Sequence, residues 1–461
     1  MLRTSAHKKA RKQESSLRHL LNPLFSKLDE RKVVYCVCGN YEELPDYTGH
    51  DVDIWTEDTG MFEKILFETA ADNGFIPYLH NKTANGSNNI FCRHADGGGM
   101  EFIRIDILNE CVWLPFIPIV TAGRIREDRL RYKNFYVAGP VTDAAMHFLY
   151  PLIHHGTVKE KYREKIHALH VDQGFRDIVS DALGSGTADY LLGRISEKDW
   201  EAVERSAASC RLRLLKRGLR HLNIKRLGYF YDFIRTNLYR LFRPSGLFIA
   251  FIGHDGAGKT TVINSLEGFF THGFLPGKFR KFYWRPYLFP DIKKLIPFYG
   301  RFAGDAVGGG DPRKIPPRNT VFSYMKFVYY FVDFVIGRVK FQSAWSRGGV
   351  VCADRYYYDH IIYPRRFRLA VPYNVMDFFK RFITKPDLTF YLYADPEVLR
   401  QRKDEFPVDE IVQQSLEYEK LLLTVPRAHR IDTSAPVSEV RDRIIRICVD
   451  YMAQRLCKHL P

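Results

Sequence analysis

The sequence has no long uncharged apolar run and no cysteine pattern of the kind that binds metals. Its most apolar stretch, residues 321–341, is interrupted by four charged residues, Lys326, Asp333, Arg338 and Lys340. We therefore expect a buried helix there rather than a membrane span. The eight cysteines form no Cys-x-x-Cys pair and no Cys/His cluster at zinc spacing, which predicts reduced, buried thiols in a cytoplasmic protein. No apolar segment follows the basic first residues, so no secretory signal is expected.

The chain is long and basic. Its 461 residues predict two or three domains, each able to bury its own core. An apolar content of 46% with 26% charged residues excludes wholesale disorder. The net charge of +16 indicates an anionic partner, which the sum alone leaves open among nucleotides, nucleic acid, a membrane surface and phosphorylated sugars. Residues 1–210 carry −4, residues 211–245 carry +9 and residues 246–461 carry +11. This distribution favours nucleotide phosphates, with a membrane surface second and nucleic acid least supported.

Hydrophobic patterning divides the chain into four parts and predicts an α/β protein. They are a basic arm (1–31), an α+β domain (32–142), a helical region ending in a basic connector (143–245) and a C-terminal domain (246–461) in which a parallel sheet is flanked by helices. Within the second part we expect strands at 32–38, 51–55 and 101–108, a helix at 59–73 and a turn at 86–89.

The clearest motif follows an apolar strand at residues 247–252. The next residues fit the phosphate-loop pattern G-x4-G-K-[ST] and precede a helical stretch. Glycines let successive backbone N–H groups surround a phosphate, and the helix N-terminus adds its dipole. Lys259 would bridge the β- and γ-phosphates of ATP, and the Thr260 hydroxyl would bind Mg²⁺. The predicted ATP-binding residues of the loop are Gly253, His254, Asp255, Gly256, Ala257, Gly258, Lys259, Thr260 and Thr261.

A second carboxylate is expected at the end of a neighbouring parallel strand. The apolar run 349–353 leads to Asp354 and Arg355. Asp354 is the predicted metal partner of Thr260. Arg355 is the predicted phosphate clamp, because its planar guanidinium matches phosphate oxygens. The alternative for this pair is an ordinary surface or capping role.

Residues 246–461 resemble the thymidylate kinase family of P-loop nucleoside monophosphate kinases. The resemblance rests on the loop 253–261, on Asp354-Arg-Tyr, on the segment from Lys385 to Val398 and on Ile431-Asp-Thr-Ser. It implies that Asp255 faces the acceptor, that residues 429–434 flank the adenine, and that a lid over ATP carries Arg400, Arg402 and Lys403. For these three cations a solvated helix face is an equal alternative.

The acceptor side departs from that family. Its thymidylate-binding members have Arg-Glu-Pro where this chain has Trp284-Arg285-Pro286, and Asp333 and Phe334 stand near the place of the residues that read thymine. The chain looks more like divergent thymidylate-kinase-like proteins encoded among bacterial surface-polysaccharide genes. Trp284, Arg285 and Tyr356 are then the predicted acceptor-binding residues, with a packing role as the alternative for Trp284. A hydroxyl acceptor would give its proton to Asp255, whereas a phosphate acceptor needs no base at neutral pH.

The N-terminal part carries a second constellation. Gly39-Asn40 ends the first expected strand, Asp51 and Asp53 follow ten residues later, and Asp106 lies on a later strand. Asp51 and Asp53 share one face of a strand, so that Asp106 would complete a three-carboxylate site for two Mg²⁺ ions. This pattern resembles the nucleotidyltransferase fold, with Asn40 in place of the usual Ser or Gly.

The leading prediction is a two-module cytoplasmic enzyme. A C-terminal kinase would use ATP and Mg²⁺ to phosphorylate a nucleotide, sugar or sugar phosphate, and an N-terminal nucleotidyltransferase would act in sequence with it. The catalytic residues would be Lys259, Arg355, Asp255 and Asp354.

Two alternatives come from other classes of protein. One is a nucleotide-binding scaffold whose N-terminal domain is degenerate. The other is a peripheral membrane protein of surface-polysaccharide assembly, at the inner face of the membrane, attached through the basic connector 211–243. For that connector, the favoured interpretation is a helix packed on a neighbouring domain with its cations in water.

Overall fold

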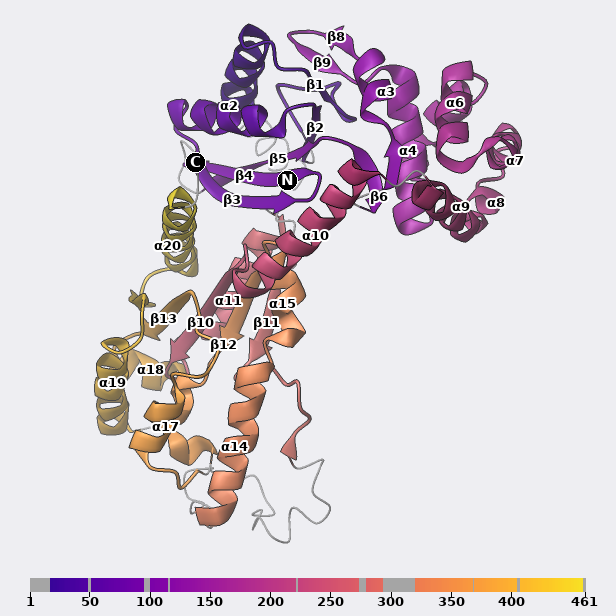
Figure 1. The fold of residues 1–461 in the computed structure, drawn as a ribbon. Helices are drawn as coiled ribbons and strands as arrows, with labels where there is room; N and C mark the ends of the chain where they lie inside the picture. The colour runs from indigo at the N-terminus through magenta and orange to yellow at the C-terminus, as the bar shows by residue number, and fades with distance from the viewer. Residues whose placement is uncertain are drawn as a thin grey trace. The chain divides into compact units, whose positions relative to one another are not determined.

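The chain forms two compact units, which are described separately. The computed structural model describes residues 17–48, 51–94, 100–114, 117–220, 223–272, 279–292, 320–367, 369–403 and 407–458 (Figure 1). One unit comprises Met1–Tyr239 with Leu456–Pro461, and the other comprises Arg240–Arg455. Most of the predicted basic arm lies outside the described residues. No helix in the described ranges is both long and apolar enough to cross a membrane.

A seven-stranded mixed sheet is the centre of the first unit, in the order β3-β4-β5-β2-β1-β9-β8. β2 pairs with β5 and β1 with β9 in parallel, and the other neighbours are antiparallel. The strands are β1 (Tyr35–Val37), β2 (Val52–Thr56), β3 (Ile76–Thr83), β4 (Gly86–His94), β5 (Met100–Leu108), β8 (Leu130–Tyr132) and β9 (Phe135–Val137).

The alternation of side chains along β1 explains why this sheet is covered on both faces. Tyr35 and Val37 pack with the leucines of the helix at residues 17–30, whereas Cys36 and Cys38 pack with the helices that follow the sheet. A small two-stranded sheet, β6 (Cys111–Leu114) with β7 (Ile117–Val120), joins this second core.

Helices make up most of the rest of the first unit, and the predicted helical pattern between residues 143 and 211 is present. α4 ends at Gly156, which has the left-handed conformation (φ +78°) that favours glycine. The helices are α2 (Thr59–Asp72), α3 (Ala122–Glu127), α4 (Pro140–His155), α5 (Glu160–Leu169), α6 (Gln173–Leu183), α7 (Ser185–Ser196), α8 (Trp200–Arg205), α9 (Ala207–Arg220) and α10 (Ile224–Phe242), whose last residues belong to the second unit.

The second unit contains a five-stranded sheet in the order β11-β12-β10-β13-β14, and all its pairings are parallel. The strands are β10 (Leu247–Gly253), β11 (Arg280–Tyr283), β12 (Val350–Asp354), β13 (Leu388–Tyr393) and β14 (Ala428–Asp432). Every residue of β10 is buried, as expected for a central parallel strand with both faces covered. The predicted α/β class is therefore correct for this unit.

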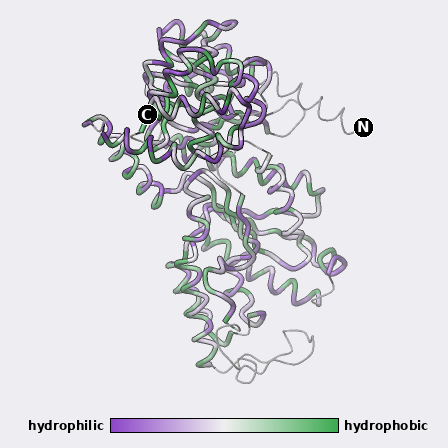
Figure 2. Tube along the Cα trace, turned by 90° about the vertical axis from the view of Figure 1, so that its right-hand side faces the viewer, coloured by the Kyte–Doolittle hydropathy of each residue, from purple (hydrophilic) through white to green (hydrophobic). Residues whose placement is uncertain are grey.

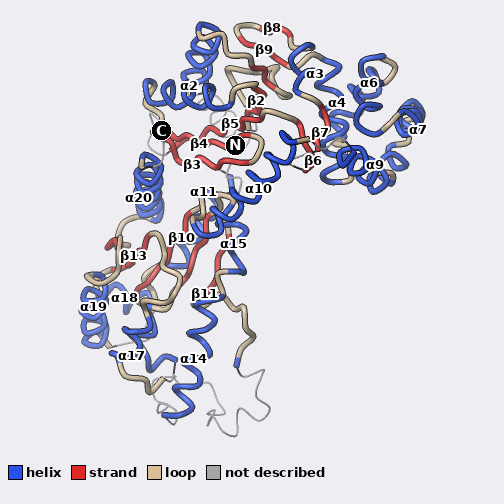
Figure 3. The backbone as a smooth tube through the Cα atoms, in the orientation of Figure 1, coloured by secondary structure: helices blue, strands red, loops and turns tan. Residues whose placement is uncertain are grey.

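Helices surround this sheet (Figure 3), and hydrophobic segments run through both units (Figure 2). The helices of the second unit are α11 (Lys259–His272), α14 (Thr320–Ile336), α15 (Val339–Ser346), α16 (Tyr358–Ile362), the 3₁₀ turn η1 (Pro364–Phe367), α17 (Tyr373–Phe379), α18 (Pro396–Arg402), α19 (Val408–Leu422) and α20 (Val437–Cys457), which ends in the first unit.

Three local predictions were wrong. Residues 86–89 are the start of β4, and the turn lies at 84–85. Gly86 is a strand residue, and glycine is required there because a side chain would collide with the Ile107 carbonyl of β5. The stretch 321–341 is not one buried helix: it breaks at Gly337, and Val321 and Met325 are exposed. Cys457 is exposed, although the other seven cysteines are buried, and none of these eight described cysteines forms a disulfide.

Candidate functional site: the phosphate loop and its carboxylates

The loop after β10 has a backbone that only glycine permits at its first position. Gly253 has φ +137°, and a Cβ there would lie 2.3 Å from the carbonyl oxygen of Leu392 on β13. Gly256 and Gly258 also have positive φ, at +82° and +77°. The chain then enters α11 at Lys259. This strand, turn and helix give the arrangement in which backbone N–H groups can surround a phosphate.

The Lys259 side chain is buried and folds back over the loop. Its ammonium donates hydrogen bonds to the carbonyl oxygens of Gly253 at 2.9 Å and His254 at 2.6 Å. Burial, together with the positive charge of Arg355, lowers the pKa of Lys259 to about 7. An anion bound at the loop would therefore stabilise the charged form of Lys259.

Thr260 and Asp354 meet, as predicted for a shared metal ion. β12 lies beside β10 with Asp354 opposite Phe251, so its carboxylate reaches the start of α11. The Thr260 hydroxyl donates a hydrogen bond to Asp354 Oδ2 at 2.9 Å. A hydroxyl and a carboxylate are hard oxygen donors, and they fit Mg²⁺.

Arg355 is held in a strained and buried position. Its backbone has φ +71°, which is costly for a residue with a side chain. The guanidinium bonds to Asp359 Oδ1 at 2.9 Å and to Asp255 Oδ1 at 2.6 Å. Two carboxylates thus fix the orientation of the planar Arg355 guanidinium beside the loop.

The carboxylate of Asp255 forms ion pairs with two arginines. Its other oxygen pairs with Arg366 on η1. Burial alone would raise the pKa of Asp255, but Arg355, Lys259 and Arg366 hold it well below the usual carboxyl range. Asp255 is therefore ionised and a weak base in this arrangement, which opposes its predicted role as a proton acceptor.

Sequence reasoning missed the residues that orient this network. The Asp359 carboxylate also accepts a hydrogen bond from the Tyr418 hydroxyl at 3.0 Å, and His254 Nε2 lies 2.9 Å from Ser415 Oγ. Burial and Lys259 lower the pKa of His254 to about 4, so its ring is neutral. No local motif marks these positions, because α16, η1 and α19 reach the loop only through the fold.

The structure places the predicted acceptor ligands Arg285 and Tyr356 in the core. Arg285 is fully buried, and its guanidinium binds Asp333 at 2.7 Å and the Phe289 and Pro290 carbonyls. The Tyr356 ring is in the core, and its hydroxyl donates to the Thr384 carbonyl. Neither side chain has a free face for an acceptor.

Trp284 adopts the packing alternative. Its ring stacks on Phe367 with centroids 4.8 Å apart and meets Tyr330 edge to face. Its backbone N–H donates to the Asp354 carbonyl at 2.8 Å. It therefore supports the strand end that carries Asp354.

The end of α18 lies against the loop. A Cβ on Gly256 would be 3.4 Å from Lys403 Cβ and 3.6 Å from Arg402 Cβ. Arg402 donates to the Thr433 carbonyl at 3.2 Å, which brings the segment after β14 to the same place. Arg400 is exposed at the end of this helix. The structure thus brings Arg402 and Lys403 to the loop.

The predicted carboxylate triad of the first unit is assembled. Asp53 and Asp106 are direct partners on the parallel strands β2 and β5, and one oxygen from each of Asp51, Asp53 and Asp106 lies within 4.8 Å of the others. Burial, then Asp51 and Asp106, raises the pKa of Asp53 to about 7. Arg104 pairs with Asp51 and Asp106. These oxygen donors fit Mg²⁺ or Mn²⁺.

The turn before this triad has the predicted glycine. Gly39 has φ +75°, and a Cβ there would lie 2.6 Å from His147 Nε2. The Asn40 side-chain oxygen accepts hydrogen bonds from Lys161 and Tyr162, both at 3.1 Å. Asn40 thereby ties the turn to α5.

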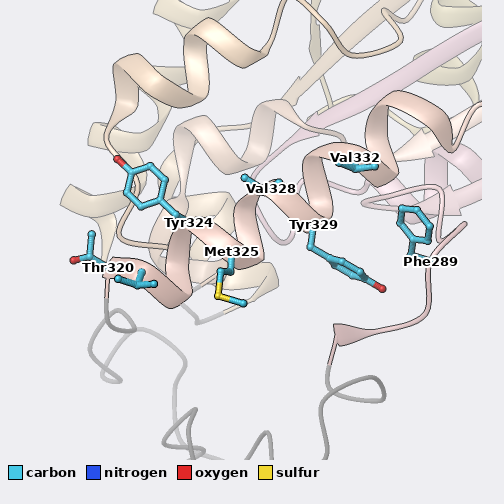
Figure 4. A pocket seen from close by; sticks show the side chains of 8 residues that line it. Phe289, Thr320, Tyr324, Met325, Val328, Tyr329 and Val332 are labelled. Carbon is cyan, nitrogen blue, oxygen red and sulfur yellow. The ribbon is translucent and has the colours of Figure 1, made fainter.

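An apolar hollow lies elsewhere on the second unit. It has a volume of about 820 Å³ and is lined by Phe289 and by residues of α14 that include Tyr324, Met325 and Val328 (Figure 4). None of the residues around the phosphate loop lines it. It is therefore distinct from the site above.

Comparison with solved structures gives distant likenesses to two thymidylate kinases. No protein-family model matches the chain, and no curated protein matches it. A thymidylate kinase from Ehrlichia chaffeensis is similar at 17% identity and a TM-score of 0.30, over 44% of this chain and 99% of that one. A thymidylate kinase from Candida albicans is similar at 17% identity and a TM-score of 0.33, over 45% of this chain and 93% of that one. Neither likeness carries a function over to this chain.

Proposed function

We propose that the second unit is a phosphotransferase that uses ATP and Mg²⁺ and transfers the γ-phosphoryl group to a small-molecule acceptor. The observation that carries this proposal is the convergence of the Lys259 ammonium, the Thr260–Asp354 pair and the Arg355 guanidinium on one glycine-rich turn. Phosphoryl transfer needs positioning and charge neutralisation more than covalent chemistry. These four side chains supply both.

Each residue has a distinct role in this proposal. The loop N–H groups hold the phosphates, and Lys259 leaves its two carbonyl partners to bind the β- and γ-phosphates. Thr260 and Asp354 hold Mg²⁺, which when bound neutralises phosphate charge. Arg355 stabilises the transferring group. Arg402 and Lys403 contribute positive charge from the end of α18, next to Gly256.

The state of Asp255 favours an acceptor that is itself a phosphate. A hydroxyl acceptor must lose a proton, and a carboxylate with a lowered pKa is a poor base for that purpose. A phosphate oxygen is already ionised at neutral pH. The acceptor class proposed is therefore a nucleotide or a sugar phosphate, and Asp255 positions Arg355 and Arg366.

An acceptor screen tests this proposal. Purified protein is incubated with ATP and Mg²⁺ and a panel of nucleotides, sugars and sugar phosphates, and products are identified by mass spectrometry. Transfer of a phosphoryl group to an acceptor that carried a phosphate before the reaction supports the proposal. Bound ATP without transfer to any acceptor would support the scaffold alternative instead.

Nucleotide binding is expected to take up a proton above pH 7. The free site has Lys259 with a pKa of about 7, so at pH 8 the amine is largely neutral, whereas a bound triphosphate favours the ammonium. Up to about one proton should enter per ATP bound, and affinity should fall by up to about tenfold per pH unit above 7. Calorimetry at pH 8 in buffers of different ionisation enthalpy measures the uptake. An equal uptake in Lys259→Met would contradict this assignment.

We propose, as a second candidate function, that the first unit transfers a nucleotidyl group with metal ions held by Asp51, Asp53 and Asp106. The carboxylate cluster supports it, since such sites place two cations on a phosphate. With sequential action, the first unit would attach a nucleotide to the product of the second. A product yield unchanged by substitution of any of the three aspartates would favour the degenerate-domain alternative.

Metal binding at this triad is expected to be tighter at pH 8 than at pH 6. The pKa of Asp53 is about 7 in the folded protein, above its ordinary value. Without metal, stability therefore falls as pH rises from about 4 to about 7, because the unfolded chain loses this proton first. Mn²⁺ should offset that loss and raise the melting temperature more at pH 8. Asp53→Asn should remove the Mn²⁺ effect and exposed Asp189→Asn should retain it; an Mn²⁺ shift that persists in Asp53→Asn contradicts the site.

A further inference from the structure

The helix α10 presents a row of exposed hydrophobic side chains. Between Ile224 and Tyr239 none of its described residues is buried. Leu227, Tyr231, Ile234 and Leu238 follow one another at intervals of four, three and four residues, so they form one stripe along the helix. Their exposed fractions are 55%, 65%, 43% and 53%. Four large apolar side chains in one such row are unusual for a protein surface and mark an interaction site.

A flank of α10 next to the stripe is attached to the rest of the first unit. Arg226 pairs with the buried Glu110 at 2.6 Å, and on the helical projection it lies about 100° from Leu227 and about 80° from Ile234. Asp232 and Arg235 pair along the helix surface at 3.2 Å. Arg226 therefore fixes the rotation of the helix without using the apolar stripe.

The charge around the stripe identifies the partner. Residues 211–243 contain ten lysines and arginines and one acidic residue, Asp232. On α9, Arg213, Lys216 and Arg220 are exposed beside the exposed Leu212 and Leu219. A second copy of the chain would bring an equally positive segment against this one, which is unfavourable. Nucleic acid would match the charge but would leave the leucines and isoleucine in water.

We propose that α9 and α10 form a docking surface for an anionic lipid bilayer. The stripe Leu227–Tyr231–Ile234–Leu238 enters the boundary between headgroups and acyl chains, and exposed cations such as Arg213, Lys216 and Arg220 bind lipid phosphates. Tyr231 suits this boundary because its ring is apolar and its hydroxyl is polar. Membrane binding is separate from the phosphotransferase proposal and requires neither nucleotide nor metal.

Vesicle co-sedimentation of the full chain tests the proposal. The wild type should bind vesicles of phosphatidylcholine with phosphatidylglycerol at low salt, and bind at least about tenfold less to phosphatidylcholine alone or in high salt. Absence of binding to the anionic vesicles overturns the proposal. So does a preference for single-stranded RNA over the vesicles in direct competition.

Matched variants separate the stripe from the general charge. Leu227→Glu with Leu238→Glu should lower the bound fraction at least about tenfold, because two acidic groups must enter the apolar boundary. Thr236→Glu with Asn237→Glu adds the same charge to other faces of the helix and should lower binding no more than about threefold. Equal losses of vesicle binding in the two double variants overturn the proposal. It is also overturned if the wild type is a dimer and only the stripe variant is a monomer.

Fluorescence gives a test that does not depend on a loss of binding. Tyr231→Trp places an indole in the stripe, and its emission, after subtraction of the wild-type spectrum, should move to shorter wavelength when anionic vesicles are added. No shift in a variant that sediments with the vesicles would show that another surface binds the lipid.

Discussion

Replacement of Lys259 by methionine is expected to lower kcat/KM for phosphoryl transfer by about 10²–10³-fold. The ammonium is the positive group closest to the loop backbone, held by the Gly253 and His254 carbonyls. Methionine has a similar length and no charge, so it removes the interaction with the transferring phosphate. Because burial and Arg355 already depress the pKa of Lys259, its loss should not lower the melting temperature.

Lys420→Met is the matched control. Lys420 is exposed on α19 and pairs with Glu417, so its replacement should leave kcat/KM within about twofold. Steady-state kinetics of both variants, with the melting temperature of each, separates lost chemistry from lost folding. A Lys259→Met protein that keeps wild-type kcat/KM would contradict the assigned role.

Replacement of Asp333 by alanine is expected to destabilise the protein by about 3–5 kcal/mol. The carboxylate is fully buried and pairs with the fully buried Arg285. It also accepts hydrogen bonds from the backbone N–H groups of Tyr287, Leu288 and Phe289. Alanine would leave a buried guanidinium without its counter-charge and three donors without an acceptor. Denaturant unfolding measures the loss.

Two further variants show whether the loss comes from the unpaired buried charge. Glu267→Ala removes the partner of Lys281 in an ion pair whose side chains are partly exposed, and should cost no more than about 1 kcal/mol. Adding Arg285→Met to Asp333→Ala should recover part of the loss, because no unpaired charge then remains in the core. A loss near 1 kcal/mol for Asp333→Ala would show that the ion pair does not organise this segment.

Local pattern predicted much of the phosphate loop and its metal pair. The loop residues are adjacent in sequence, and the glycine at position 253 is required by the close approach of Leu392. Asp354 ends an apolar strand, and parallel pairing with β10 brings it to Thr260. These positions follow from strand pattern and motif, which short segments of sequence contain.

The acceptor side was not predictable in the same way. Trp284 and Arg285 look like ligands because an aromatic ring and a guanidinium suit a phosphorylated sugar. Only the fold shows that Asp333 on α14 takes the guanidinium and that Phe367 covers the ring. Likewise, Arg366 is separated from Asp255 by 111 positions, and no short-range pattern connects them.

In the first unit, sequence spacing located the carboxylates but not their surroundings. Asp51 and Asp53 are two residues apart, so their side chains share one face of a strand. For Asp106 the sequence predicted a strand but not its distance from the other two carboxylates. The Arg104 guanidinium inside the cluster and the bonds from Lys161 and Tyr162 to Asn40 come from pairings across the unit. Such pairings depend on strand order, which spacing alone does not give.

The fate of the γ-phosphoryl group tests the central claim most directly. ATP labelled with ¹⁸O in the γ-phosphoryl group is incubated with the protein, Mg²⁺ and the acceptor panel, and products are resolved by mass spectrometry. We expect unlabelled ADP and a labelled phosphoryl group on an acceptor phosphate. Labelled inorganic phosphate alone, or AMP with labelled pyrophosphate as the only products, would contradict a phosphotransferase at the phosphate loop.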